Sequence, residues 1–311
     1  MASDVIRLGS RGSQLALWQA EHIRAEVERH TGWKVEITKI KTTGDMILDV
    51  PLSKVGGKGL FVKEIEEALL ENRIDLAVHS MKDVPTELPP GLEIVCITRR
   101  EDPRDAFLSG MYQSLEELPK GAKLGTSSLR RQTQLLGLRP DISIHPLRGN
   151  LDTRIRKMEE GQYDAIVLAA AGLRRLGWEG KIRQYLPEDL SIPAIGQGAL
   201  GIEIRGADAR TREAVAFLND RDTSVAVRAE RAFLKRLEGG CQVPVAAHGT
   251  IAGGAVTLVG LVGRPDGSEI LRGRRSGPVG DPEAVGVALA EELLSRGGKK
   301  ILDEVYRQSG P

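Results

Sequence analysis

The sequence predicts an α/β fold of two doubly wound lobes, followed by a small α+β unit at the C-terminal end. Two observations predict the lobes. A strand, a short loop and a helix occur near the N-terminus and again from residue 123, and each copy is followed by a helix that leads into another apolar strand. Strands that alternate with helices are typical of parallel sheets with right-handed crossovers. The length of 311 residues also exceeds one ordinary domain.

The first copy begins at the N-terminal strand. The largely apolar residues 5–8 predict this strand, residues 9–13 form a Gly/Ser-rich loop, and the amphipathic pattern of residues 14–30 predicts a helix. A helix over residues 62–72 then leads into a strand over residues 75–78. The first lobe is thus predicted to contain at least two strands with helical crossovers.

The second copy repeats this plan from Lys123. A short strand runs into Thr126 and then into a helix that continues through Leu136. A second helix over residues 152–160 leads into a strand over residues 164–168. Two halves that share a plan are expected to face one another across a cleft, with ligands beyond the carboxyl ends of the strands.

The segments that join the lobes are polar or contain proline, and we expect hinges over residues 99–104 and 190–196. A third unit follows, with a helix over residues 224–237, glycine-rich strands around residues 256–262 and a closing helix over residues 282–296. The predicted domains are residues 1–98 with 199–216, residues 104–192, and residues 221–311.

The composition excludes several classes of protein. The 44 Lys and Arg residues against 43 Asp and Glu residues give a net charge of +1, too balanced for a nonspecific nucleic-acid binder, and aromatic residues make up only 4%. No apolar run approaches the roughly 20 residues that span a bilayer. No secretory signal is visible at the start of the sequence, so we expect a cytoplasmic protein, and we further expect a monomer.

The two cysteines differ in their surroundings. Cys96 lies in an apolar alternation that predicts a buried strand, where a free thiol packs as a small hydrophobe. Cys241 follows Gly239 and Gly240 on a loop, where its sulfur can meet another molecule. Because a reactive thiolate needs access and nearby positive charge, Cys241 is either a reactive group or a surface thiol of no consequence.

Residues 126–131 combine hydroxyl groups with guanidinium groups at the start of a helix. Thr126, Ser127 and Ser128 supply hydroxyl and backbone donors, while Arg130 and Arg131 bring positive charge into the first turn. Arginines at that position oppose the helix dipole, which favours an anion there. The alternative is that the hydroxyl groups only cap the helix.

Further arginines follow other predicted strands. Arg11 and Ser13 lie in the loop of the first copy, and Arg148 and Arg154 lie in a segment that follows another strand. Guanidinium groups at several strand ends, in a chain of almost no net charge, predict a small polyanion that carries carboxylates or phosphates.

Asp83 lies at the end of the apolar strand that contains Val78. Lys82 is beside it, and Pro85 stops the strand. An acid at the carboxyl end of a strand, next to a lysine, is the candidate catalytic carboxylate. The alternative is that Asp83 only makes a turn before Pro85.

Two glycine-rich segments do not match nucleotide-binding loops. Residues 54–59 contain Lys54 and Lys58 but lack the flanking residues of a P-loop, and a solvated turn is the alternative. Residues 196–201 fit the pattern G-x-G-x-x-G but lead into a strand, so we assign their glycines to the hinge and to close approach of a ligand. The five histidines and two cysteines lack metal-ligand spacing, and no metal is predicted.

Five ordered motifs carry a resemblance to a known family. They are LALWQA at residues 15–20, VGGKGLF at 55–61, HSMKDVP at 79–85, GTSSLRR at 125–131 and EGGC at 238–241. Together they resemble the hydroxymethylbilane synthase family, also called the porphobilinogen deaminase family. The likeness extends from about Ile6 to Tyr306, nearly the whole chain.

The resemblance implies a fold and an activity. Two lobes would be like a type II periplasmic binding protein, and a third domain would carry a dipyrromethane cofactor joined to Cys241 by a thioether. The enzyme, a transferase of haem and tetrapyrrole biosynthesis, would condense four porphobilinogen molecules onto that primer, releasing ammonia each time, and then hydrolyse off linear hydroxymethylbilane. Asp83 would be its catalytic residue.

The resemblance also implies which residues bind substrate and cofactor. Pyrroles that carry acetate and propionate need cationic and hydroxyl donors. The implied binding residues are Arg11, Ser13, Lys54, Lys58, Phe61, Ser80, Lys82, Thr126, Ser127, Ser128, Arg130, Arg131, Arg148, Gly149, Asn150, Arg154, Ala169, Arg175, Gln197 and Gly198.

Two other functions remain open from the residues alone. A solute-binding protein of the same two-lobed fold would bind an anion without transforming it. A cysteine-nucleophile transferase would need a base near Cys241, and His248 is the nearby candidate in sequence. A covalent pyrrole adduct on the purified chain would distinguish the expected enzyme from both.

Overall fold

The computed structural model describes residues 5–46, 62–238 and 243–309. The chain divides into two compact units. The first comprises Met1–Asp49, Gly57–Arg100 and Ala199–Ser224, and the second comprises Val50–Gly56, Glu101–Gly198 and Val225–Pro311. Within the described ranges, none of the helices is both long enough and apolar enough to cross a membrane.

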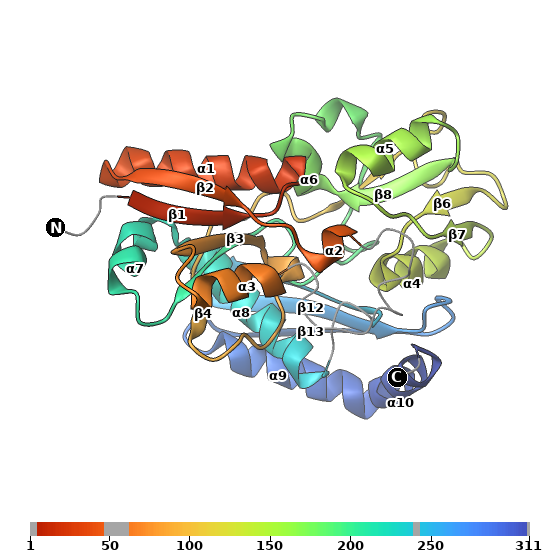
Figure 1. Cartoon of the computed structure of the whole chain (residues 1–311). Helices are drawn as coiled ribbons and strands as arrows, with labels where there is room; N and C mark the ends of the chain where they lie inside the picture. The colour runs from red at the N-terminus through yellow and green to blue at the C-terminus, as the bar shows by residue number, and fades with distance from the viewer. Residues whose placement is uncertain (1–4, 47–61, 239–242, 310–311) are drawn as a thin grey trace. The chain divides into compact units, whose positions relative to one another are not determined.

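The first unit contains a five-stranded sheet in the order β2-β1-β3-β10-β4 (Figure 1). β1 is parallel to β2 and β3, whereas β10 is antiparallel to β3 and β4. The strands are β1 (Val5–Ser10), β2 (Lys34–Lys39), β3 (Leu76–Ser80), β4 (Leu92–Ile97) and β10 (Leu200–Arg205). The helices described in this unit are α1 (Gln14–Thr31), α2 (Thr43–Met46), α3 (Lys63–Leu70) and α7 (Ala209–Val215).

Helix α1 shows how the sequence specifies these elements. Ser13 caps it by accepting a hydrogen bond from the backbone N–H of Ala16 at 3.3 Å. The helix ends at Gly32, whose φ of 73° only glycine adopts at little cost, and whose N–H donates to the carbonyl of Glu28. The side chains at 19, 20, 23 and 27 are buried. Their i, i+4 spacing puts them on the side of α1 that lies along β1 and β2 (Figure 1).

The second unit contains another five-stranded sheet, in the order β7-β6-β8-β5-β9. β6 is parallel to β7 and β8, whereas β5 is antiparallel to β8 and β9. The strands are β5 (Asp105–Leu108), β6 (Lys123–Gly125), β7 (Ser143–His145), β8 (Ala165–Ala169) and β9 (Gln184–Leu186). The helices between them are α4 (Leu129–Leu138), α5 (Leu151–Glu159) and α6 (Ala170–Arg175).

The two sheets share one plan, as the sequence predicts. In each, three parallel strands are followed by an antiparallel strand and then by an edge strand. Each sheet also contains antiparallel pairs, which the sequence analysis did not predict. The antiparallel strands are those that follow the two chain crossings, β5 after the first and β10 after the second, so each crossing reverses strand direction where the chain enters or re-enters a sheet.

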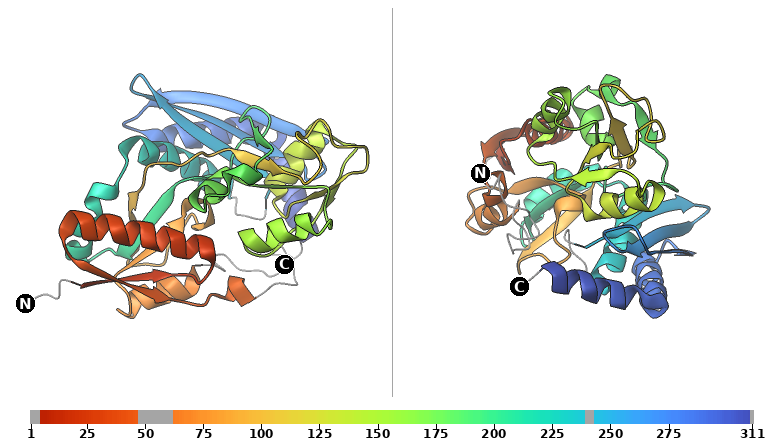
Figure 2. Two further views of the ribbon diagram at one scale, coloured as in Figure 1. Left: turned by 90° about the horizontal axis from the view of Figure 1, so that it is seen from above. Right: turned by 90° about the vertical axis from the view of Figure 1, so that its right-hand side faces the viewer.

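The remainder of the second unit is an antiparallel sheet, β11-β12-β13, with helices packed against it (Figure 2). Its strands are β11 (Val245–Ala252), β12 (Ala255–Gly263) and β13 (Ile270–Pro278), and its helices are α8 (Arg221–Arg236), which begins in the first unit, α9 (Pro282–Leu293) and α10 (Lys299–Ser309). Phe233 of α8 and Leu289 of α9 are fully buried in the core on this sheet.

The C-terminal helices differ from the prediction of one helix over residues 282–296. Helix α9 ends at Leu293, and the segment Leu294–Gly298 contains a kink at Gly297, whose φ is 110°. A further helix, α10, follows this kink. The sequence analysis ended the helix just before Gly297 and Gly298, and it did not predict the helix beyond them.

Close approach of α8 and α9 yields a stability prediction. A Cβ at Gly286 would collide with the backbone oxygen of Ala229 and lie 2.8 Å from the backbone nitrogen of Phe233. The backbone of a packed helix cannot move aside without a large cost in free energy. Gly286→Ala is therefore expected to lower the free energy of unfolding by about 2 kcal/mol, despite the better helix propensity of alanine.

Chemical denaturation checks this expectation. Gly280→Ala is the matched control, because a Cβ there meets nothing within 4 Å. Equal stabilities of the Gly286 variant and the control would contradict the close packing of these helices.

Candidate active site

In the first unit, two groups of predicted site residues lie at the same edge of the sheet. Arg11 and Ser13 follow β1, while Ser80, Lys82 and Asp83 lie at and beyond the end of β3. Because β1 and β3 are parallel neighbours, their carboxyl ends are adjacent. The loop after β1 and the turn after β3 therefore adjoin, as expected from the sequence.

Asp83 ends a single 3-10 turn, Met81–Asp83, that β10 holds in place. The N–H of Met81 donates to the carbonyl of Ala199 at 3.0 Å, and the N–H of Val84 closes the turn on the carbonyl of Met81 at 3.3 Å. The Met81 side chain is buried and fills the space that a Cβ on Gly201 would occupy. Backbone pairing and packing thus fix where the turn begins.

The carboxylate of Asp83 is half-buried, and within the described residues no hydrogen bond or ion pair engages it. Ser80 next to the turn accepts a hydrogen bond from Gln19 of α1 at 3.1 Å. A carboxylate that is partly withdrawn from water without a protein donor remains available to a ligand.

The second unit repeats this arrangement. Residues 126–131 follow β6, residues 147–154 follow β7, and Ala169 ends β8 before α6. These three strands are parallel neighbours, so the predicted residues after them lie along one edge of the sheet.

The hydroxyl groups after β6 are used within the chain. Ser128 caps α4 by accepting from the N–H of Arg131 at 3.4 Å, and Thr126 accepts from the N–H of Ser128 at 3.2 Å. The Ser127 hydroxyl donates to the carbonyl of Leu147 and accepts from its N–H. The capping alternative is therefore what this structure contains, and a role of these hydroxyl groups in binding an anion stays a prediction.

Arg130 and Arg131 have an anionic partner inside the chain. Both are buried and donate to the carboxylate of Asp105, with shortest distances of 2.7 and 2.8 Å. Ser191 and Gln197 also donate to Asp105, which accepts six hydrogen bonds in all. Burial would raise the pKa of Asp105, but the two guanidinium groups hold it well below its usual range.

This cluster carries two positive charges against one negative charge. The premise that the arginines need a negative partner is correct, and Asp105 supplies it. Because Asp105 neutralises only one of two buried guanidinium groups, the cluster remains electropositive and suits a further anion. Burial accordingly lowers the pKa of Arg131 despite Asp105.

Two other predicted arginines of the second unit are in no ion pair of the described residues. Arg148 and Arg175 are half-buried, and burial lowers the pKa of both, that of Arg175 to about 10. Arg175 donates to the carbonyl of Gly198 at 2.6 Å. Partly desolvated guanidinium groups without carboxylate partners are suited to an external carboxylate.

Gly149, Asn150, Ala169 and Gln197 are further predicted residues of this unit. Gly149, at φ 110°, accepts through its carbonyl from Arg154 at 2.7 Å. Asn150 and Ala169 precede α5 and α6 and cap neither helix through a side chain. Gln197 is buried and donates to the carbonyl of Pro103 and to Asp105, while its Oε1 has no partner in the described part of the chain.

Some predictions concern residues that the structure does not describe. Lys54, Lys58, Phe61 and Cys241 lie outside the described residues. The other cysteine agrees with its prediction. Cys96 is buried on β4, its thiol donates to the carbonyl of Val215 at 3.1 Å, and burial raises its pKa to about 11, so it is unreactive.

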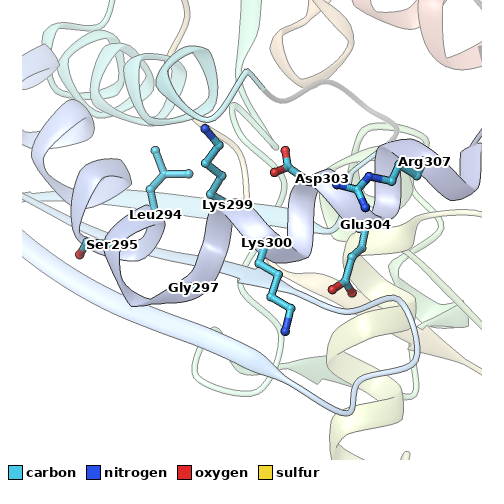
Figure 3. A pocket seen from close by; sticks show the side chains of 8 residues that line it. All are labelled: Leu294, Ser295, Gly297, Lys299, Lys300, Asp303, Glu304 and Arg307. Atoms are coloured by element: carbon cyan, nitrogen blue, oxygen red, sulfur yellow. The ribbon is translucent and has the colours of Figure 1, made fainter.

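The surface hollow at the C-terminal helices is lined by residues that are not among those predicted for the site. Across residues 5–46, 62–238 and 243–309, no three His, Cys, Asp or Glu side chains could hold a metal ion together. Figure 3 shows a hollow at the kink before α10, lined by Leu294, Ser295, Gly297, Lys299, Lys300, Asp303, Glu304 and Arg307. Its mixed charges differ from the electropositive strand ends.

The structure adds residues that the sequence interpretation missed. Asp105 orients two predicted arginines, and Gln19 orients Ser80. His79 on β3 bonds to buried Glu203 on β10 at 2.8 Å. An acid at one end of an apolar strand was the signal that identified Asp83. The same kind of signal, at the start of a strand, could have identified Asp105. Gln19 and Glu203 give no such signal, since their partners are distant in sequence.

Comparison with known proteins gives matches along nearly the whole chain. A family profile described as "Porphobilinogen deaminase, dipyromethane cofactor binding domain" matches residues 6–213, and one described as "Porphobilinogen deaminase, C-terminal domain" matches residues 224–295. Porphobilinogen deaminase of Geobacter sulfurreducens is 59% identical over 309 residues, which is 99% of this chain and 97% of that protein. That of Pelobacter propionicus is 60% identical over 304 residues, covering 97% and 98%.

Solved structures give a more distant likeness. A nutrient binding protein from Burkholderia cenocepacia bound to methionine aligns with 68% of this chain and 89% of its own, at 13% identity and a TM-score of 0.42. The methionine binding protein MetQ aligns with 69% and 89%, at 14% identity and a TM-score of 0.45.

The Asp105 cluster makes a testable prediction about stability. Asp105→Asn leaves two buried guanidinium groups without a charged partner, which is expected to cost about 3–5 kcal/mol of unfolding free energy. Asp141→Asn is the matched control, because Asp141 pairs with Arg139 at 2.7 Å near the surface, where an ion pair contributes up to about 1 kcal/mol. Urea denaturation of both variants compares them. A loss at position 105 no larger than that of the control would refute the importance of this carboxylate.

Proposed function

The chain belongs to the porphobilinogen deaminase family, and on that premise we propose that Asp83 is the catalytic carboxylate of its reaction. The activity is that of a transferase in tetrapyrrole and haem biosynthesis. It condenses four porphobilinogen molecules head to tail onto a dipyrromethane cofactor, and then releases linear hydroxymethylbilane by hydrolysis.

Each condensation breaks a C–N bond and forms a C–C bond. The protonated amino group of porphobilinogen leaves as ammonia with the electrons of its C–N bond, so the methylene carbon that remains becomes part of a cationic azafulvene. A free pyrrole carbon attacks that methylene, which moves the positive charge to the attacking ring, and that ring regains neutrality when the attacking carbon loses its proton. The barrier therefore depends on stabilising a positive charge and on moving protons.

Asp83 suits both tasks. A carboxylate can accept hydrogen bonds from pyrrole N–H groups, stabilise the developing cation, and take up the proton that the attacking pyrrole carbon loses. The observation that carries the proposal is that this half-buried carboxylate, on a turn fixed by β10, has no donor in the described part of the chain. A carboxylate without internal partners is free to meet the substrate at each of the four condensations.

The cationic residues of the second unit fit a dipyrromethane with acetate and propionate groups. Arg148 and Arg175 lack ion-pair partners among the described residues, the Asp105 cluster keeps an excess positive charge, and the Oε1 of Gln197 can accept a pyrrole N–H. When bound, the dipyrromethane supplies the free pyrrole carbon on which the chain grows. The protein's own contribution is to neutralise carboxylates and hold the rings in place.

The further binding residues follow the same chemistry. In the first unit, Arg11, Ser13, Ser80 and Lys82 are proposed to bind substrate beside Asp83, and the loop with Lys54, Lys58 and Phe61 is proposed to assist them. In the second unit we propose Thr126, Ser127, Ser128, Arg130, Arg131, Gly149, Asn150, Arg154, Ala169 and Gly198. The described residues that follow β1, β3, β6, β7 and β8 lie at the carboxyl ends of parallel strands, and this position supports their assignment.

We assign three domains to these tasks. Residues 1–98 with 199–216 would carry Asp83, residues 104–192 the anion-binding arginines, and residues 221–311 the cofactor cysteine. The three sheets support this division, because each one lies wholly inside one of these ranges. We further propose that the protein acts in the cytoplasm as a monomer; light scattering coupled to gel filtration tests the oligomeric state.

Replacing the catalytic carboxylate tests the main proposal. Asp83→Asn keeps the shape of the side chain but removes its charge and basicity, so turnover is expected to fall by about 10²- to 10⁴-fold. The bound primer should remain, as measured by the intact mass of the variant. Glu36→Gln is the control, because Glu36 is an exposed carboxylate of the same sheet. Near-normal turnover in Asp83→Asn would dismiss the assignment.

Intact mass also tests the anchor. The purified chain is expected to exceed its polypeptide mass by two linked pyrrole units, and Cys241→Ser should lack that increment because it lacks the thioether sulfur. Cys96→Ala, which alters a buried thiol, should retain it. An adduct on Cys241→Ser would contradict the anchor, and a wild-type chain of bare polypeptide mass would favour a solute-binding protein or a transient cysteine nucleophile.

A further inference from the structure

Three ionisable side chains of the first unit are buried on β3, β10 and α3, which pack against one another. His79 of β3 is 5% exposed, Glu203 of β10 is 1% exposed, and Glu66 of α3 is 7% exposed. The Nε2–H of His79 donates to Oε2 of Glu203 at 2.8 Å. Isolated buried charges are costly, so the group needs an internal means of neutralisation.

Two oxygens in this cluster lack donors. Oε1 of Glu203 and Oε1 of Glu66 are buried, and neither has a hydrogen-bond partner in the described part of the chain. Two ionised carboxylates cannot satisfy each other, because both are acceptors only. A single proton between them would remove one charge and turn one oxygen into a donor.

The charges around Glu66 favour this arrangement. Burial first, and then the negative charge of Glu203, raise the pKa of Glu66 to about 7, with His79 opposing. Glu67 of α3 adds a weaker repulsion. On the other strands that contact α3, the charged groups have their own partners: Arg7 of β1 with Asp75, Arg205 of β10 with Asp75 and Asp208, and Glu93 of β4 with Arg212.

We propose that Glu66 is a neutral carboxyl that donates its O–H to Glu203, and that the resulting chain Glu66–Glu203–His79 positions the turn of the catalytic Asp83. His79 is the last fully buried residue of β3 before that turn. With the bond from Met81 to Ala199, β10 then holds this end of β3 through both backbone and side chains. His79, Glu203 and Glu66 are thus positioning residues, and their kinetic role rests on the proposed function of Asp83.

The shared proton has a signature in stability that needs no enzyme assay. Glutamate ordinarily ionises near pH 4.5, and Glu66 in the folded protein near 7. Its contribution is therefore fully present below pH 4.5 and is lost as the pH rises through 7. The wild-type holoenzyme should show a falling Tm between pH 5 and 8.

Glu66→Gln should remove this part of the pH dependence, because its amide still donates to Glu203 but cannot ionise. Glu67→Gln, an exposed neighbour on the same helix, should follow the wild type. Equal pH slopes of Tm in Glu66→Gln and the wild type would overturn the shared proton.

The positioning role is tested through His79. His79→Leu breaks the link to Glu203 and should lower kcat about tenfold with KM unchanged, whereas His79→Gln, which can donate to Glu203, should restore most of it. In an Asp83→Asn background, His79→Leu should cost little more, because both changes act through one group. An undiminished kcat in His79→Leu, or an equal loss in both backgrounds, would overturn positioning.

The two proposals fail separately. If Asp83→Asn alone kept normal turnover, the function assigned to Asp83 would be wrong, while the Tm comparison would still decide whether Glu66 and Glu203 share a proton.

Discussion

The buried carboxylate of Asp105 is the interaction on which the second unit depends. It lies at the start of β5 and accepts hydrogen bonds from Arg130 and Arg131 at the start of α4, and from Ser191 and Gln197 on the returning crossing. One acid thus joins a strand, a helix start and the chain that leaves the sheet. Because it balances only one of two guanidinium charges, the same contact that stabilises the unit leaves it attractive to an anion.

In the first unit, strand β10 supports the turn that carries Asp83. β10 enters the sheet after the chain has built β5 to β9, and it pairs antiparallel with β3. Three residues in or next to β10 support the end of β3: the carbonyl of Ala199 accepts from Met81, Gly201 leaves room for the Met81 side chain, and Glu203 binds His79. The turn of Asp83 is therefore held in place by residues more than 100 positions later in the sequence. The position of the proposed catalytic group thus depends on the pairing of β10 with β3.

This long-range dependence explains how far sequence could predict the molecule. Periodicity gave α1, α4, α8 and the paired plan of the sheets, because these patterns are local. It could not give the antiparallel direction of β5 and β10, which depends on how the chain crosses between sheets. Arg130 and Arg131 were recognisable as unusual at a helix start, but their partner lies 25 and 26 residues away on a strand, and residue spacing does not reveal such a pairing. Glu203 alternates with apolar residues and resembles any strand acid until its neighbours are known.

The acids of this protein illustrate how surroundings decide chemistry. Asp105 is fully buried yet held ionised, since guanidinium groups surround it. Glu66 is buried beside another acid, and burial together with the negative charge of Glu203 raises its pKa to about 7. Asp83 is half-buried on a fixed turn with no donor in the described part of the chain. A carboxylate that stabilises a transient cation must not be engaged by donors of the protein itself. Of these three, Asp105 is saturated by donors of the chain and Glu66 is buried in the core, so Asp83 is the acid placed to serve a substrate, and the other two stabilise the units in which they lie.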